Sequence, residues 1–196
     1  SAYEAAKAEL AHRKPLHVIN EEMVPALDVV GQGFEKGTLF LPQLLMSAEA
    51  AKAAFEAVRE ALESAGSRPE KKGKIVIATV QGDIHDIGKN IVKVLLENYS
   101  YDVIDLGKDV PPETVVEAVV RDHVQLAGLS ALMTTTVENM AKTIEALHRE
   151  APWCKVMVGG AVLTPEYAEM IRADHYAKDA MGSVRYAEKI FGSDTE

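Results

Sequence analysis

Apolar and polar positions follow two different patterns along the chain, and the change falls near residue 66. Before that point, apolar residues recur three and four positions apart and Ala, Glu, Leu and Met are frequent, as in amphipathic helices. This pattern predicts three helices, over residues 2–12, 15–33 and 41–65. Gly37 lies in the break before the third helix, Pro42 suits its first turn, and Pro25 is expected to bend the second helix.

After residue 73 short apolar runs alternate with helical stretches. The runs are KIVIATV, DVIDLG, LAGLSAL, KVMVGG and a short HYA segment, and a last helix is expected over about 179–191. Strands that alternate with helices form right-handed βαβ units, which build a parallel sheet with helices on both faces. Five strands suit the flavodoxin-like order 2-1-3-4-5. We therefore predict an α/β fold, a flavodoxin/Rossmann-like five-stranded parallel sheet preceded by a helical domain.

The stretch GSRPEKKGK, residues 66–74, combines Gly, Ser, Pro and like charges. Such a composition is typical of an exposed connector between domains. We predict a helical domain over residues 1–66, a linker over 67–73 and an α/β domain over 74–196. Gly66 and Gly73 make the connector the expected hinge.

Composition narrows the classes of function. The chain has 196 residues, of which 47% are hydrophobic, and a net charge of −9. This charge argues against nucleic-acid and anionic-membrane partners, which need clustered Lys and Arg. The chain has no apolar run of about 20 residues and its N-terminus has no signal pattern, so we expect a cytoplasmic protein. The single cysteine, Cys154, is interpreted as a buried or half-buried strand residue.

Unusual residues follow three of the predicted strands. The loops are GDIHDIG after the first strand, SALMTTT after the third and VGGAVLT after the fourth. These strands are neighbours in the predicted order, so the loops should meet at the carboxyl edge of the sheet, where ligands bind in open α/β folds. Taken singly, such glycines are more often turn residues, Ser and Thr before a helix are more often caps, and a lone loop histidine is more often solvated.

Together the three loops resemble the signature of cobalamin-binding domains that hold the corrinoid with its nucleotide tail detached. The matching motifs are Asp83-x-His85-x-x-Gly88, Ser130-x-Leu132 and Gly159-Gly160. The resemblance implies that His85 binds the cobalt and that Asp83 and Thr136 extend the ligand into a relay, with Thr where the methionine synthase type usually has Ser. The cofactor-binding residues implied on this side are Asp83, His85, Asp86, Gly88, Ser130, Leu132, Thr134, Gly159 and Gly160.

Chemistry gives reasons for these residue types. A neutral imidazole is a good ligand for a transition metal such as cobalt. Its other ring nitrogen needs a hydrogen-bond acceptor, and Asp83, two residues before His85, is the expected one. The resemblance further implies that Ser130 forms a hydrogen bond with the base of the displaced nucleotide tail, and that Gly159 and Gly160 line the slot for this tail.

The helical domain has a resemblance of its own. The stretch GFEKGTLFLPQLLMSAEA, residues 33–50, resembles the cap of corrinoid methyltransferase proteins, a four-helix bundle that covers the upper face of cobalamin. The resemblance implies that Phe40 and one of Leu44, Leu45 and Met46 shield the cobalt-bound methyl group. For any one of these residues, a place in the ordinary core of the bundle is an equally good interpretation. Only for Phe40 do we favour contact with the methyl group.

Residues from about 15 to 191 resemble the cobalamin module of methionine synthase and the corrinoid subunits of methanol, methylamine and aryl-ether systems. Our main prediction is a methionine synthase-like module, in which methylcobalamin carries a methyl group from methyltetrahydrofolate to homocysteine. The partners implied are methyl-donor and methyl-acceptor domains or subunits and a reductive reactivation partner, so the chain is an incomplete catalyst alone. The alternative is a free-standing corrinoid subunit.

Three other classes remain as alternatives. Adenosylcobalamin mutases share the signature but lack a helical cap directly upstream, and B12 photoreceptors need a DNA-binding domain, which neither the charge nor any motif supplies. A cofactor-free flavodoxin-like signalling domain would leave Asp83, His85 and the double glycine without a role.

Overall fold

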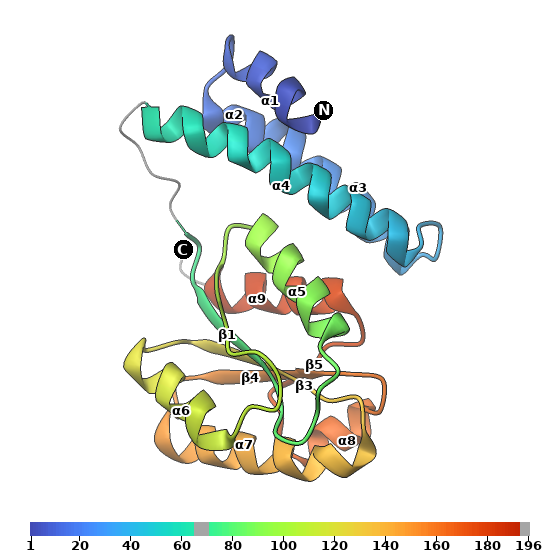
Figure 1. The fold of residues 1–196 in the computed structure, drawn as a ribbon, viewed down its shortest axis with the longest axis vertical. Helices are drawn as coiled ribbons and strands as arrows, with labels where there is room; N and C mark the ends of the chain where they lie inside the picture. The colour runs from blue at the N-terminus through green and yellow to red at the C-terminus, as the bar shows by residue number, and fades with distance from the viewer. Residues whose placement is uncertain (65–70, 193–196) are drawn as a thin grey trace. The chain divides into compact units, whose positions relative to one another are not determined.

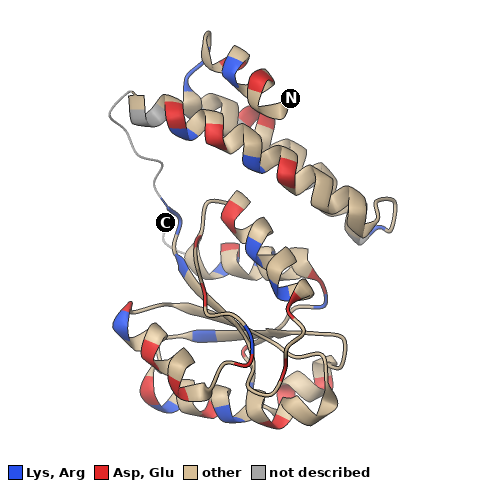
Figure 2. Cartoon of the chain, in the orientation of Figure 1, with Lys and Arg blue, Asp and Glu red and all other residues tan. Residues whose placement is uncertain are grey.

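The computed structural model describes residues 1–64 and 71–192, which belong to two compact units, Ser1–Glu70 and Lys71–Glu196. The first unit is helical and the second is an α/β domain (Figure 1). Acidic and basic residues are interspersed along the long helix of the first unit and along the helices of the second (Figure 2). In the described ranges, no helix combines the length and the apolar character that crossing a bilayer requires.

The helices of the first unit are α1 (Ala2–Leu10), α2 (Pro15–Val18), the π-helix η1 (Ile19–Met23), α3 (Val24–Glu35) and α4 (Leu41–Ser64). α4 packs along α1, and Val18, Met23 and Val58 form a small apolar core. The first and third predicted helices correspond to α1 and α4, and residue 65, the predicted end of the third, lies outside the described residues.

The predicted helix over 15–33 is interrupted. Its middle is a π-helical turn, and Pro25 is the second residue of the α-helix that follows. Because proline has no backbone N–H and its ring collides with the preceding turn, an α-helix cannot run regularly through this position, and the wider π turn accommodates the change. The predicted bend is thus a change of helix type just before Pro25.

Gly37 and Pro42 lie as predicted around the start of α4. Gly37 has a φ of +70°, a left-handed conformation that favours glycine, directly after the α3 C-cap. Pro42 is the second residue of α4, and the side chain of Gln43 accepts a hydrogen bond from the Phe40 N–H at 2.8 Å. This bond is one half of a capping box and fixes the entry into the helix.

The second unit has the predicted five-stranded parallel sheet in the order β2-β1-β3-β4-β5. Its elements are β1 (Lys74–Thr79), α5 (Ile87–Asn98), β2 (Asp102–Asp105), α6 (Pro112–Arg121), β3 (Leu126–Ser130), the 3-10 helix η2 (Thr134–Thr136), α7 (Val137–Glu150), β4 (Lys155–Gly159), α8 (Pro165–Met170), β5 (His175–Tyr176) and α9 (Ala180–Phe191). In Figure 1, α5 and α9 cover one face and α6, α7 and α8 the other.

Alternate residues of β1, and Val80 directly after it, point to opposite faces of the sheet. Val76, Ala78 and Val80 belong to the large apolar core that includes residues of α6 and α7. Because successive strand residues point to opposite faces, Ile77 and Thr79 face α5 and α9. The register pairs Thr79 with Ser130 and Ser130 with Gly159, so three strands end level with one another.

Lys72 and Gly73, which fall in the predicted linker, are held by the α/β unit. The Lys72 N–H donates to the Ser100 carbonyl at 3.0 Å, and the Asp102 N–H donates to the Gly73 carbonyl at 2.9 Å. A side chain at Gly73 would collide with the ring of Phe191, at 2.3 Å. Gly73 therefore serves close packing, contrary to the flexible role that its sequence context predicts.

We expect Cys154 to be chemically inert in the folded protein. Its side chain is 1% exposed, just before β4, which agrees with the predicted burial, and desolvation raises the pKa of its thiol to about 12. Iodoacetamide at pH 8 should leave the native protein unlabelled and add one label per chain in guanidinium chloride, as measured by mass spectrometry. Rapid labelling of the native protein would contradict this burial.

Candidate functional site

The histidine loop, residues 80–86, joins the end of β1 to the start of α5 and places His85 at the carboxyl edge of the sheet. Asp83 is completely buried in it, whereas the His85 side chain is 47% exposed. The two large apolar side chains that flank His85, Ile84 and Ile87, are 63% and 76% exposed. The loop thus presents an imidazole amid apolar side chains, an arrangement that marks a binding surface.

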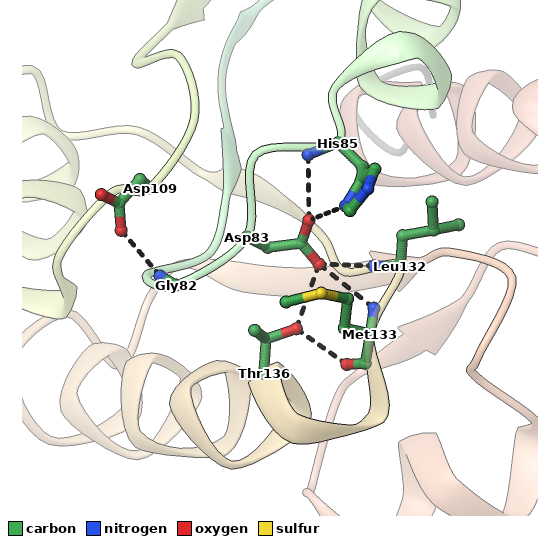
Figure 3. A network of polar contacts seen from close by, with 7 residues as sticks. All are labelled: Gly82, Asp83, His85, Asp109, Leu132, Met133 and Thr136. Atoms are coloured by element: carbon green, nitrogen blue, oxygen red, sulfur yellow. Dashed lines mark hydrogen bonds and ion pairs between the residues drawn. The ribbon is translucent and has the colours of Figure 1, made fainter.

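The two oxygens of Asp83 face different partners (Figure 3). Oδ1 accepts hydrogen bonds from the His85 backbone N–H at 2.9 Å and lies 2.8 Å from Nδ1 of the same residue. Oδ2 accepts bonds from the backbone N–H groups of Leu132 and Met133, at 2.7 and 3.2 Å. The Thr136 hydroxyl lies 3.0 Å from Oδ2 and 2.8 Å from the Met133 carbonyl, so its one proton is shared. Asp83 therefore joins the loops after β1 and β3.

This environment keeps Asp83 ionised. Burial by itself raises the pKa of a carboxyl group, but the hydrogen bonds from His85, Leu132 and Thr136 outweigh it, and the pKa of Asp83 lies well below its usual range. An ionised carboxylate only accepts, so Nδ1 of His85 carries a proton, and in the neutral imidazole the lone pair is then on Nε2. His85 is oriented as a metal-ligating imidazole has to be.

The ends of β1, β3 and β4 contribute one row of small residues on the α5/α9 face. Thr79, Ser130 and Gly159 are paired in register across these strands. Ser130 is half-buried, while Thr79 is completely buried and its hydroxyl is the buried side-chain polar atom without a hydrogen-bond partner in the described part of the chain. Such an unpaired hydroxyl indicates a missing partner beside the row.

The glycines at the site differ in whether the packing of the chain requires them. A side chain at Gly88, in the first turn of α5, would meet open space, so the packing of the chain itself does not require glycine there. Gly160 has a φ of +139°, and a Cβ there would lie 1.8 Å from the Ala131 carbonyl oxygen. The close approach of two loops is by itself a reason for glycine at residue 160, and the predicted place of Gly160 in a ligand slot stays a prediction.

Other predicted residues lie at the rim. Asp86 is half-buried and is the N-cap residue of α5, where its carbonyl accepts the Asn90 N–H. The Leu132 side chain is 42% exposed, although its N–H is one of the donors to Asp83. Thr134 is exposed, in η2. These positions leave the three side chains accessible to a ligand.

In the helical unit, Phe40 and Met46 are 67% and 72% exposed, and Leu45 is 38% exposed. Leu44 is 1% exposed and belongs to the interior, so it is removed from the candidates for contact with a ligand. The helical period accounts for this difference, because neighbouring positions of a helix point to different sides and one side of α4 is buried. Contact of the other three with cobalamin stays a prediction.

Several functional groups were missed by the sequence prediction. The backbone donors of Leu132 and Met133 carry no sequence signal, because any residue except proline supplies an N–H. Gly128, inside β3, was also missed, although a glycine in a strand signals close packing. A Cβ there would lie 3.1 Å from Met157 and 3.3 Å from Ile77, below the row formed by Thr79 and Ser130.

Comparisons with known proteins agree with this geometry. Two family models, each described as a B12 binding domain, match residues 73–191 and 1–59. Dimethylamine corrinoid protein 1 of Methanosarcina acetivorans is 41% identical, over 97% of this chain and 88% of its own length. Trimethylamine corrinoid protein 1 of Methanosarcina mazei is 42% identical, over 90% of this chain and 82% of its own length.

Solved structures give the same result. A cobalamin-binding protein from Desulfitobacterium hafniense DCB-2 is 28% identical, with a TM-score of 0.73 over 96% of this chain and 98% of that one. The methanol:cobalamin methyltransferase complex of Methanosarcina barkeri contains a chain that is 31% identical, with a TM-score of 0.78 over 95% of this chain and 71% of that one. With a B12-binding model over most of the chain and corrinoid relatives over nearly all of it, this protein belongs to the family of cobalamin-binding corrinoid proteins.

Proposed function

We propose that this protein holds a corrinoid through His85 and carries methyl groups within a methylamine-type methyltransferase system. The observation that carries the proposal is the Asp83–His85 pair, in which Asp83 accepts the Nδ1 proton of a half-exposed ring and leaves Nε2 as the nitrogen for a metal. The relatives named above belong to dimethylamine, trimethylamine and methanol systems, so they favour a free-standing corrinoid subunit over our main prediction of a methionine synthase module. The expected role in methionine formation is therefore dropped.

The residues of the site fit a bound corrinoid. Open space over Gly88 and the exposed side chains of Ile84 and Ile87 suit a broad, largely apolar ring placed above His85. The unpaired Thr79 hydroxyl and the neighbouring Ser130 supply hydrogen-bonding groups where the detached nucleotide base would lie. Gly159 and Gly160 border the same slot, although Gly160 is also needed by the fold.

Bound cobalamin supplies a cobalt atom that accepts a methyl group from one substrate and passes it to another. The chain would contribute the ligand and orient it. His85 would hold the metal through Nε2, Asp83 accepts the proton on Nδ1, and Thr136 helps to hold Asp83. Because the pKa of Asp83 lies well below its usual range, this carboxylate stays an acceptor for the Nδ1 proton of His85.

The partners follow from the family. A methyltransferase protein would deliver the methyl group, a second would remove it, and a reductive protein would restore the cofactor after accidental oxidation. Phe40, Leu45 and Met46 stay our candidates for apolar contact with the upper face of cobalamin. Their exposure in the helical unit makes them available for it.

His85→Ala should remove the protein ligand from cobalt. In the parent protein loaded with hydroxocobalamin, the absorption spectrum should be that of cobalamin with its own base displaced and an imidazole bound. The His85→Ala spectrum should lack the imidazole, while His17→Ala, at an exposed histidine of α2, should match the parent. Asp83→Asn should weaken ligation less than His85→Ala, since the ring remains. Identical spectra for His85→Ala and the parent would refute the proposal.

Thr136→Val should destabilise the α/β unit, because it removes a hydrogen bond to a buried carboxylate while keeping the shape of the side chain. Bonds to charged groups contribute about 1.5–3 kcal/mol, so the free energy of unfolding should fall by about that amount. Thr136→Ser should lose less, since it keeps the hydroxyl. Urea unfolding followed by the fluorescence of Trp153, the single tryptophan, reports on this unit. Equal stability of the Val and Ser variants would argue against the bond.

The methyl donor can be tested directly. The reduced holoprotein should take up labelled methyl groups from dimethylamine or trimethylamine when a methyltransferase of that specificity is added. Methanol and methyltetrahydrofolate, each with its own methyltransferase, should give little transfer. Scintillation counting of the reisolated protein measures the label. Preferred uptake from methyltetrahydrofolate would restore the methionine synthase interpretation.

A further inference from the structure

Asp109, in the loop between β2 and α6, holds the turn that precedes His85. Its Oδ1 accepts a hydrogen bond from the Gly82 N–H at 2.7 Å (Figure 3), and its own N–H donates to the Asp83 carbonyl at 2.9 Å. The two loops are far apart in sequence, and the two bonds run in opposite directions between them. Together they fix both the position and the orientation of the backbone at residues 82 and 83.

Asp109 has the backbone conformation that this contact needs. Its φ is +54° and that of Gly82 is +85°, so both lie in the left-handed region. Aspartate and asparagine adopt this region more readily than other non-glycine residues. The loop is also aligned with β1, because the Thr79 N–H donates to the Gly107 carbonyl at 2.9 Å and the Val110 N–H donates to the Thr79 carbonyl at 3.1 Å. The register of the sheet therefore sets the place of Asp109.

The same loop also contacts the chain beyond His85. Lys89, in the first turn of α5, is buried and forms an ion pair with Asp105, at the end of β2. Asp105 accepts a further hydrogen bond from the Gly107 N–H at 2.9 Å, and Lys93 lies 3.7 Å from it. Residues 105–110 thus contact the chain on both sides of His85, in the histidine loop before it and in α5 after it.

We infer that Asp109 is a positioning residue for His85. The inference rests on the proposed role of His85 as the cobalt ligand. The Asp83 side chain is fixed by donors from the β3 loop, whereas its backbone is held at two points: its carbonyl accepts the Asp109 N–H, and its own N–H donates to the Val80 carbonyl at 3.0 Å. Without the Asp109 carboxylate, the Gly82 N–H loses its acceptor and the peptide before Asp83 gains freedom to rotate. The His85 ring then adopts a wider range of orientations, and the fraction of molecules in which Nε2 is oriented to bind the metal falls.

Two variants separate the hydrogen bond from the backbone conformation. Asp109→Gly removes the acceptor and tolerates a φ of +54°, whereas Asp109→Asn keeps an acceptor oxygen and also tolerates it. Asp102→Asn, at an exposed aspartate at the start of β2, is the matched control. Each protein is loaded with hydroxocobalamin, and the absorption spectrum gives the equilibrium between histidine-ligated and histidine-free cobalt. Trp153 fluorescence verifies folding.

Asp109→Gly should shift this equilibrium about threefold to tenfold toward the histidine-free form, the range expected for one lost hydrogen bond. Asp109→Asn and Asp102→Asn should stay near the parent value. An unshifted equilibrium in Asp109→Gly overturns the inference, and so does an equal shift in the Gly and Asn variants, which would assign the effect to charge. Lower cobalamin content with a parent-like spectrum also overturns it, since that result indicates a purely structural role. If the parent itself shows no histidine ligation, the proposed function fails first, and the inference with it.

Discussion

The buried carboxylate of Asp83 is the interaction on which the site depends. A carboxylate cannot be removed from water without compensation, and here the compensation comes from backbone donors of two loops, a threonine hydroxyl and the imidazole itself. These donors belong to segments about 50 residues apart in the sequence, so the hydrogen bonds can form together only after β1 and β3 have paired. The same bonds that stabilise the charge therefore bring the loops of the site into place and set the tautomer of His85.

The parallel sheet makes this arrangement possible. Thr79, Ser130 and Gly159 share one register row, so the loops after their strands start at the same level. Beside them, the β2–α6 loop extends the pairing of β1 through the bridge between Val80 and Val110. The loops that follow β1, β2 and β3 consequently meet around residue 83, although each of them is short. A half-exposed histidine gains a defined direction from this framework.

Much of this was predictable from the sequence, because it depends on local pattern. The strand order, the short fifth strand, the break at Gly37 and the pairing of Asp83 with His85 all follow from periodicity, turn residues and motif spacing. What could not be predicted depends on tertiary geometry. The π turn before Pro25, the N–H donors of Leu132 and Met133, and the clamp formed by Asp109 leave no local signal. Gly160 has a second reason that the sequence does not give, the close approach of Ala131.

Function and stability make different demands on neighbouring residues at this edge of the sheet. The framework around Asp83 is fully bonded and buried, as a stable core requires, whereas Ile84 and Ile87 are left exposed to water. A ligand that covers the two isoleucines would remove this apolar surface from water on binding. Under the proposed function, the boundary between protein and ligand thus runs through His85, whose Nδ1 is bonded to Asp83 and whose Nε2 would bind the metal.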